Sequence, residues 1–237
     1  MLPTPIVKDV DYEKVYEPAE DSFLLLDCLE EEQEFIQSRF KNIIPIITEI
    51  GGGSGIVTTF LHKNILPNSI FITTDINPHA CEAILNTVKV NKIDQDQDQD
   101  KPSTNSKIPT IPYLIDSCQM DLTSGIKAQE IDLLVFNPPY VPAEIVPEIP
   151  TNLNDDTWLD LALMGGEDGM ITTWKILDNL HNILNPLHGV AYILFCARNK
   201  PDQVAQTMTS RGWNVETVIL RKAGWEVLSI LKFTKTS

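Results

Sequence analysis

The sequence predicts an α/β fold: one seven-stranded, mostly parallel, doubly wound sheet with an antiparallel last strand and a helix at the N-terminus. From residue 43 onward, short apolar runs rich in β-branched residues alternate with longer helical patterns, which is typical of a parallel sheet between helices. Hydrophobic residues make up 43 % of the 237 residues, enough for one sizeable core. The turn at Gly224 is too short for a parallel crossover, so the last two runs pair antiparallel.

The elements follow in a regular order. Pro18 suits the first position of an acidic N-terminal helix, whose apolar stripe is Phe23, Leu24, Leu25, Leu26 and Leu29. The predicted strands cover residues 43–50, 69–74, 111–115, 131–136, 190–197, 215–220 and 227–233. The further helices are predicted at about 56–64, 78–91, 167–184 and 200–211. We interpret residues 1–237 as a single domain in which 1–42 form a helical extension.

One segment interrupts this alternation. Residues 94–100 read DQDQDQD and are followed by another polar stretch. Such a low-complexity sequence cannot bury a core. We therefore interpret residues 93–109 as a flexible polar insertion before the third strand.

Charge and cysteine content exclude some classes of protein. The chain has 33 acidic and 18 basic residues, for a net charge of −15, which disfavours direct binding of a nucleic-acid backbone. No apolar run reaches the roughly 18 residues of a membrane span. The four cysteines and four histidines are scattered and predict no metal site. Reduced cysteines indicate a cytoplasmic protein, with the nucleus as the alternative.

A glycine-rich loop follows the first predicted strand and opens onto a helix. It reads Glu49-Ile50-Gly51-Gly52-Gly53-Ser54-Gly55. Glycines let the backbone turn tightly and approach a ligand closely, and the helix N-terminus favours an anion. The spacing departs from the dinucleotide fingerprint G-x-G-x-x-G, because residue 56 is Ile. A ligand other than a dinucleotide is therefore favoured.

Acidic residues follow the next two strands. Asp75 ends the second strand, 24 residues after Gly51, where a carboxylate can accept both ribose hydroxyls of a nucleoside. Asp121 follows the third strand and can accept from an adenine amino group, while Leu122 packs on the ring. The two loops together indicate a nucleoside site at the carboxyl edge of the sheet.

The fourth strand ends in Asn137-Pro138-Pro139-Tyr140. The prolines fix the backbone, and the amide oxygen of Asn137 and the carbonyl of Pro138 offer two acceptors. Two acceptors at a fixed separation suit a planar –NH2 group, whose flat face Tyr140 would cover. The segment therefore predicts a site that aims an –NH2 nitrogen at an electrophile.

Together these residues resemble the class I S-adenosylmethionine-dependent methyltransferases of the NPPY type, which have a Rossmann-like fold. The resemblance is stronger to the HemK-like protein-glutamine methyltransferases, in particular the fungal release-factor branch. It is carried by YEPAEDS at 16–22, the loop at 49–55, NPPY at 137–140 and GGEDG at 165–169. One departure is Gly52, where relatives often carry Ser, which we expect to make the loop more flexible.

The resemblance implies roles for individual residues. Ser22 lies near the cofactor S-adenosylmethionine, and Glu49, Gly51 and Gly53 belong to the loop under its methionine moiety. Asp75 matches the ribose acid, and Asp121 with Leu122 matches the adenine contacts. Asn137 bridges cofactor and substrate. With Pro138, Pro139 and Tyr140, it forms the substrate site, and Asn137, Pro138 and Tyr140 are the catalytic residues.

The resemblance also implies a substrate and partners. The substrate is the glutamine of the Gly-Gly-Gln motif in the class 1 translation release factor, alone or with its GTPase partner. The chain is then the catalytic subunit of a heterodimer with a small zinc-binding activator, which carries any zinc. The predicted third strand, 111–115, is apolar enough to dock that subunit at the edge of the sheet, although Pro112 also blunts a bare edge.

Alternative functions remain open on the sequence alone. NPPY chemistry also suits the adenine amino group of DNA or RNA, and less well a lysine in another protein. A methyltransferase-like scaffold without activity is the alternative outside the enzymes. No Cys, Ser or His dyad for a covalent intermediate is evident, so direct methyl transfer to the amide nitrogen is expected.

Overall fold

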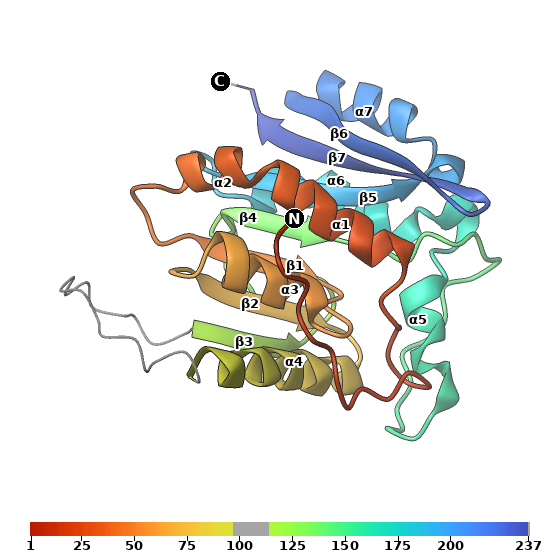
Figure 1. The fold of residues 1–237 in the computed structure, drawn as a ribbon. Helices are drawn as coiled ribbons and strands as arrows, with labels where there is room; N and C mark the ends of the chain where they lie inside the picture. Colours follow the sequence, from red (N-terminus) through yellow and green to blue (C-terminus); the bar gives the residue numbers. More distant parts are fainter. Residues whose placement is uncertain (97–113, 237) are drawn as a thin grey trace.

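The computed structural model describes residues 1–96 and 114–236 of the chain (Figure 1). Seven strands form one sheet in the order β3-β2-β1-β4-β5-β7-β6. The strands are β1 (Ile46–Ile50), β2 (Ile70–Asp75), β3 (Leu114–Gln119), β4 (Leu133–Phe136), β5 (Val190–Cys196), β6 (Trp213–Ala223) and β7 (Glu226–Lys235). The predicted seven-stranded fold is therefore confirmed.

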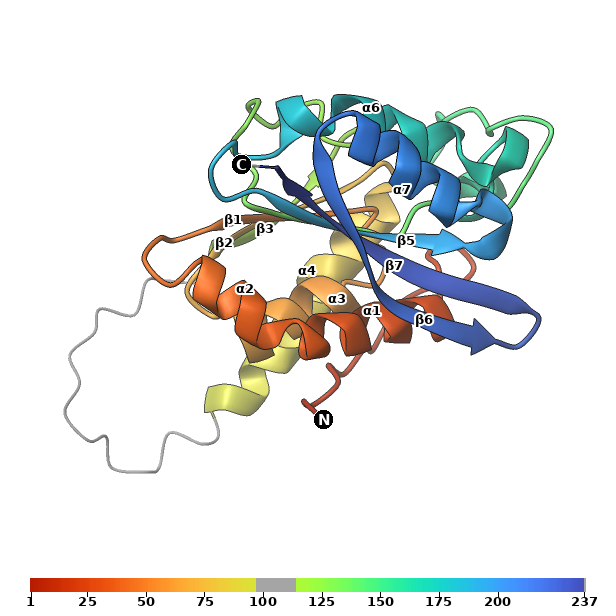
Figure 2. The ribbon, with the colours of Figure 1, turned by 90° about the horizontal axis from the view of Figure 1, so that it is seen from above.

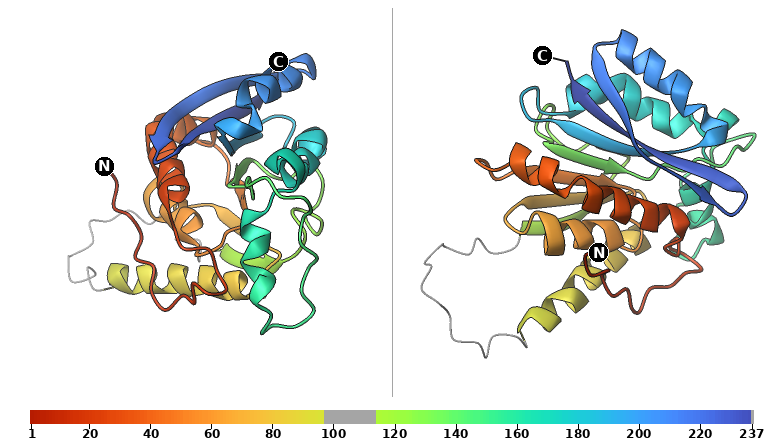
Figure 3. Two further views of the ribbon diagram at one scale, coloured as in Figure 1. Left: turned by 90° about the vertical axis from the view of Figure 1, so that its right-hand side faces the viewer. Right: turned by 45° about the horizontal axis from the view of Figure 1, so that its top comes forward.

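Pairing directions also agree with the sequence prediction. Strands β3, β2, β1, β4 and β5 run parallel to one another, whereas β7 pairs antiparallel with both β5 and β6. The turn between β6 and β7 consequently lies at the same end of the sheet as the carboxyl ends of the parallel strands (Figure 3). Strand β3 is at one edge of the sheet, as predicted.

Helices cover both faces of the sheet (Figure 2). The α-helices are α1 (Glu20–Glu31), α2 (Gln33–Arg39), α3 (Ile56–Phe60), α4 (Pro78–Asp96), α5 (Asp160–Leu163), α6 (Ile171–Ile183) and α7 (Pro201–Ser210). A π-helical turn follows α3 at Leu61–Ile65, and 3₁₀ turns lie at Asp156–Trp158, Glu167–Gly169 and Ala197–Asn199. One core packs α1 to α3 against the sheet, and a second packs α6 and α7 against the opposite face. No helix in the described parts of the chain is long and apolar enough to span a membrane.

The N-terminal helix differs in detail from its prediction. It begins at Glu20, so Pro18 lies two residues before the helix rather than at its first position. The predicted apolar stripe is buried at its four leucines, but Phe23 is 41 % exposed. The predicted stripe is too wide, because only one face of α1 reaches the sheet.

Other boundaries also differ from the prediction. The helix predicted at 167–184 is interrupted where Asp168 and Gly169 have φ angles of +55° and +67°, and α6 begins only at Ile171. The predicted insertion at 93–109 begins inside α4, which continues to Asp96, and the rest lies outside the described residues. The third strand, predicted at 111–115, extends to Gln119, and residues 111–113 lie outside the described part.

Candidate active site

The register of the strands brings three loops to one place. Ile50, the last residue of β1, pairs with the penultimate residue of β2 and with the last residue of β4. Gly51, Asp75 and Asn137 therefore reach the carboxyl edge of the sheet side by side. Open α/β sheets bind their ligands at this edge.

A cavity of about 430 Å³ lies at this edge. It is lined by every residue that the sequence singles out for the site: Ser22, Glu49, Gly51, Gly53, Asp75, Asp121, Leu122, Asn137, Pro138, Pro139 and Tyr140. The structure thus brings all of them to one cavity, and their individual roles stay predictions.

The glycine loop forms the floor of the cavity. Gly51 and Gly53 have φ angles of +65° and +53°, which glycine adopts readily. The N–H of Gly51 donates to the Thr74 carbonyl at 2.8 Å, which ties the loop to β2. A Cβ at Gly55, where φ is +80°, would lie 2.7 Å from the Cα of Ile84 in α4. The glycines therefore allow both the tight turn and the close packing of α3 on α4.

Gly52 is held more tightly than the sequence suggests. The residue is buried, and a Cβ there would lie 2.3 Å from Cγ2 of Thr73 and 2.8 Å from Cδ1 of Ile84. The expectation that Gly52 loosens the loop therefore finds no support in its packing, because neighbouring side chains occupy the space that a side chain at 52 would need.

Asp75 faces the loop from the end of β2. Its carboxylate accepts hydrogen bonds from the backbone N–H groups of Gly53, at 3.0 Å, and Asn77, at 2.9 Å. Burial raises the pKa of Asp75 to about 6, and the backbone donors act in the opposite direction. Asp75 is thus mostly a carboxylate at neutral pH, and each oxygen retains acceptor capacity toward the cavity.

The wall beyond Asp75 is made by Asp121 and Leu122. Asp121 is exposed, and Leu122 has a φ of +53°. A leucine in the left-handed region is strained by roughly 1 kcal/mol or more, and such strain concentrates at ligand sites. The side chain of Leu122 also packs on the core beneath α6, which holds this wall in place.

Glu49 is a buried acid beside the glycine loop. It is 5 % exposed, and its carboxyl group accepts from the N–H of Thr58 at 2.8 Å and from the Thr58 hydroxyl. Burial raises the pKa of Glu49 to about 8, against the opposing effect of the Thr58 hydrogen bonds. In the unfolded chain the ordinary value is 4.5. Between these two values the folded protein retains a proton that the unfolded chain has lost.

This difference predicts a pH-dependent stability. The free energy of unfolding should fall as pH rises from about 4.5 to about 8, by at most ~1.4 kcal/mol per pH unit from this group. Glu49→Gln should remove that slope, because the amide does not titrate. Urea unfolding at pH 5 to 8 measures it, with Glu144→Gln as the matched carboxyl-to-amide replacement at an exposed position. If the free energy of unfolding depended on pH in the same way for wild type and Glu49→Gln, the raised pKa of Glu49 would be contradicted.

Asn137 is one of the residues that line the cavity. The amide nitrogen Nδ2 donates to Oδ2 of Asp21 at 3.1 Å. The amide oxygen Oδ1 is buried and makes no hydrogen bond with any described residue. A buried carbonyl without a partner costs about 1–3 kcal/mol. Its presence at the cavity wall indicates an acceptor that a ligand satisfies.

Tyr140 closes the cavity beside Asn137. Its hydroxyl lies 3.4 Å from Oε2 of Glu226 and 3.5 Å from Oδ2 of Asp21. Burial, followed by the charges of these two acids, raises the pKa of Tyr140. The hydroxyl therefore stays protonated and donates, which fixes the ring as a flat wall.

The glycines at 165–169 support the NPPY segment from behind. A Cβ at Gly165 would lie 2.3 Å from the Pro139 carbonyl oxygen, and one at Gly169 would lie 2.0 Å from that of Tyr140. Nδ2 of Asn199 donates to the same Tyr140 carbonyl at 3.2 Å. The segment that follows NPPY in sequence thus holds its backbone in place.

We expect Gly169→Ala to displace the NPPY backbone. The added methyl group would overlap the Tyr140 carbonyl, and the φ of +67° is unfavourable for alanine. The expected result is a loss of stability of about 1–3 kcal/mol, together with reduced activity. Thermal unfolding measures the first, with Gly224→Ala as control, because that glycine also has positive φ but no neighbour within 4 Å. Equal losses of stability in Gly169→Ala and Gly224→Ala would show that the positive φ angle alone accounts for the effect, without overlap with the Tyr140 carbonyl.

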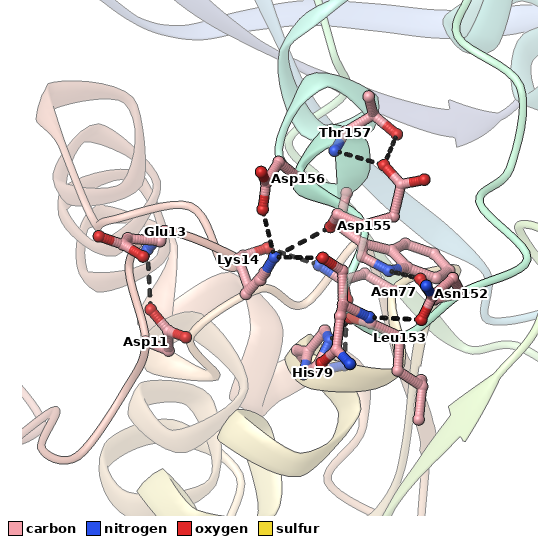
Figure 4. Close-up of polar contacts among 12 residues, drawn as sticks. Asp11, Glu13, Lys14, Asn77, His79, Asn152, Leu153, Asp155, Asp156 and Thr157 are labelled. Carbon is pink, nitrogen blue, oxygen red and sulfur yellow. Dashed lines mark hydrogen bonds and ion pairs between the residues drawn. The ribbon is translucent and has the colours of Figure 1, made fainter.

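Segments distant in sequence form the outer wall of the cavity. Nζ of Lys14 contacts Oδ1 of Asp156 at 2.7 Å and the carbonyls of Asn154 and Asp155 (Figure 4). The buried Trp158 from the same loop packs edge-on against His79 of α4, with ring centroids 6.4 Å apart. The N-terminal segment and the loop after NPPY are thereby joined over the start of α4.

Several cavity residues were not predicted from the sequence. They are Tyr16, Asp21 and Trp158. Glu226 does not line the cavity, but it contacts the hydroxyl of the cavity residue Tyr140. Tyr16 and Asp21 stand in the YEPAEDS segment, which marks this stretch as part of the site, but the resemblance implies a role only for Ser22 within it. Glu226 and Trp158 carry no local signal, because tertiary packing alone brings them near. Within 1–96 and 114–236 no group of three His, Cys, Asp or Glu side chains could hold a metal ion.

Comparison with known proteins reveals relatives over nearly the whole chain. Human methyltransferase HEMK2 is 33 % identical over 225 residues, covering 95 % of this chain and 92 % of that protein. The Schizosaccharomyces pombe eRF1 methyltransferase catalytic subunit mtq2 is 35 % identical over 240 residues, covering 98 % and 95 %. No protein-family model matches the chain.

Solved structures support the fold. The E. cuniculi Mtq2–Trm112 complex, which methylates the termination factor eRF1, aligns with a TM-score of 0.60 at 22 % identity, covering 94 % of this chain and 99 % of that chain. The N-terminal domain of human METTL16 in complex with SAH aligns with a TM-score of 0.58 at 15 % identity, covering 95 % and 74 %. The resemblance inferred from the motifs is confirmed by the full-length relatives, and the chain belongs to the HEMK2/Mtq2 family of methyltransferases.

Proposed function

We propose that this chain transfers the methyl group of S-adenosylmethionine to the side-chain amide nitrogen of the glutamine in the Gly-Gly-Gln motif of the class 1 translation release factor. The observation that carries the proposal is the buried, unpartnered Oδ1 of Asn137 at the cavity wall. A planar amide –NH2 group satisfies such an acceptor. The full-length similarity to the S. pombe eRF1 methyltransferase catalytic subunit supports the choice of substrate.

The residues of the cavity fit the cofactor. Asp75 holds the ribose hydroxyls, Asp121 and Leu122 hold the adenine, and Glu49, Gly51 and Gly53 lie along the methionine moiety with Ser22. When bound, S-adenosylmethionine supplies an activated methyl group on a sulfonium. The carboxylate of Asp75, which is mostly ionised at neutral pH, favours a ligand of positive charge over the pyrophosphate that a glycine loop otherwise attracts.

The chain's own residues then position the amide nitrogen, which is a poor nucleophile because its lone pair is delocalised. Oδ1 of Asn137 and the Pro138 carbonyl accept its two hydrogens and so orient it. The same oxygens stabilise positive charge that grows on nitrogen in the transition state. Pro139 fixes their separation, and Tyr140 covers the flat face of the amide.

We further propose that the chain is the catalytic subunit of a heterodimer with a small zinc-binding activator in the cytoplasm. The edge strand β3 is the proposed contact. Its Leu114 is 50 % exposed, and among the described strands β3 pairs only with β2, so its other edge offers backbone hydrogen-bonding groups to a partner. The similar Mtq2 of E. cuniculi is found in complex with Trm112.

The direct test is mass spectrometry of the release factor after incubation with the reconstituted complex and cofactor. A gain of one methyl group on the glutamine, absent when that glutamine is replaced by alanine, is the expected result. Methylation of plain oligonucleotide at the same rate would favour the adenine alternative, which the net charge of −15 disfavours. Methylation of a lysine alone, or failure to bind cofactor, would contradict the proposal.

A further inference from the structure

Asp21 is a buried acid at the cavity to which the proposed chemistry assigns no role. It is the second residue of α1 and is 3 % exposed. Its carboxylate accepts from Nδ2 of Asn137 at 3.1 Å and from the Tyr16 hydroxyl at 3.2 Å, and the Tyr140 hydroxyl lies 3.5 Å away. It also accepts from the N–H of Ser22 at 2.6 Å. All of these partners are donors, so the carboxylate is fully engaged on the protein side.

The contact with Asn137 determines which way that amide faces. A carboxylate only accepts hydrogen bonds, so the atom of Asn137 that faces Asp21 must be the nitrogen. The oxygen is then turned the other way, where it is buried and has no partner among the described residues. If the Asn137 amide were reversed, its Oδ1 would face the carboxylate of Asp21, and two acceptors would be in contact. The donor Nδ2 would then take the place of Oδ1 on the other side.

We infer that Asp21 is a positioning residue that holds Asn137 in the one amide orientation able to accept the substrate –NH2. The inference rests on the proposed function, because the substrate amide supplies the missing partner of Oδ1. Asp21 itself does not touch the substrate. Its negative charge also polarises the Asn137 amide, which strengthens Oδ1 as an acceptor while positive charge grows on the substrate nitrogen.

The two tyrosines complete this arrangement. Burial and the neighbouring Asp21 raise the pKa of Tyr16, and burial raises that of Tyr140, so both hydroxyls stay protonated as donors. They occupy lone pairs of Asp21 that would otherwise compete for a donor on the substrate. A neutral amide in the cavity therefore meets the free carbonyl of Asn137, because the acceptor positions of the Asp21 carboxylate are already occupied.

A purely structural role is the competing explanation. An acid in the first turn of α1 stabilises the helix through the helix dipole, whatever it contacts. If the role is purely structural, replacing Asp21 should lower the melting temperature of the protein without a specific change in kcat. If Asp21 positions Asn137, the same replacement should lower kcat and leave the cofactor affinity unchanged.

The first variant is Asp21→Asn, assayed with the full chain in its activator complex. The new amide can donate to Oδ1 of Asn137 and so permit the reversed orientation. We expect kcat to fall by about 10- to 100-fold, as for loss of one charge-assisted hydrogen bond, with the cofactor Kd within about threefold of wild type. The matched control is Asp27→Asn on the same helix, which pairs with Arg221 at 2.6 Å and does not line the cavity. It should leave kcat unchanged.

The decisive variant exchanges the two groups. In Asp21→Asn combined with Asn137→Asp, the amide introduced at position 21 donates to one oxygen of the carboxylate introduced at position 137, and the other oxygen stays free to accept from the substrate. Asn137→Asp alone places two acids in contact. The double variant should therefore be at least about tenfold more active than Asn137→Asp. An activity no higher than that of Asn137→Asp, or a wild-type kcat in Asp21→Asn, would overturn the inference.

Two further measurements separate the possible failures. If Asp21→Asn does not fold, as judged by its melting temperature, the double variant alone decides. If the wild-type complex leaves the release factor unmethylated, the proposed function fails, and crystal structures of wild type and Asp21→Asn still test the orientation. An Asn137 amide nitrogen that remains turned toward residue 21 in Asp21→Asn would contradict the positioning role.

Discussion

Asn137→Ala should lower the rate of methyl transfer by a factor on the order of 10² to 10³, the loss expected when one preorganised polar partner of a transition state is removed. The alanine deletes the unpartnered Oδ1 and leaves the Pro138 carbonyl as the only proposed acceptor. The substrate amide then loses both its orientation and the oxygen that faces its developing positive charge. Single-turnover transfer to the release factor measures the effect.

Cofactor affinity and folding are the controls for this variant. The Asn137 side chain lies beside the cofactor region but supplies little of its proposed binding energy, so the Kd for S-adenosylmethionine should stay within a few-fold of wild type. Asn179→Ala, on α6 and outside the cavity, should behave as wild type in both assays. A transfer rate within a few-fold of wild type in Asn137→Ala would remove Asn137 from the mechanism.

Asp75→Ala should weaken S-adenosylmethionine binding by about 10²-fold. Hydrogen bonds from ligand hydroxyls to a carboxylate contribute about 1.5–3 kcal/mol each, and the two ribose hydroxyls have no other predicted acceptor. The backbone N–H groups of Gly53 and Asn77 also lose their acceptor, which loosens the loop. Calorimetric titration of the complex with cofactor measures the Kd.

The same carboxyl group predicts how binding depends on pH. Burial raises the pKa of Asp75 to about 6, and the ribose hydroxyls donate to its ionised form. Protonation therefore competes with binding, and the Kd should rise about tenfold per pH unit below 6. Asp75→Ala should lose this dependence, whereas Asp178→Ala on α6 should retain it. An unchanged Kd in Asp75→Ala at pH 7 would refute the ribose role.

The arrangement of the sheet could be predicted from the sequence because each parallel strand is a short, buried, β-branched run. The residues that follow such strands meet at one edge, so the sequence alone predicts that Gly51, Asp75 and Asn137 lie together. The common position of these three residues is a property of the fold class. The sequence therefore reveals which residues line the cavity, although it does not reveal their distances.

Element boundaries and cross-element partners could not be predicted in this way. Pro18 fits a first helical position by its φ angle, but Ala19 is extended, with φ −126° and ψ −165°, so α1 begins only at Glu20. The contact of Asp21 with Asn137 joins residues 116 positions apart, and no local pattern encodes it. Glu226 reaches Tyr140 only because β6 and β7 place their turn beside the cavity.

The central claim is tested most directly by a crystal structure of the activator complex with a Gly-Gly-Gln peptide and S-adenosylhomocysteine. The account predicts that the glutamine amide nitrogen lies about 2.7–3.2 Å from both Oδ1 of Asn137 and the Pro138 carbonyl oxygen. Its nitrogen should point at the sulfur of the product cofactor. A peptide bound with that amide away from Asn137, and Oδ1 still without a partner, would contradict the account.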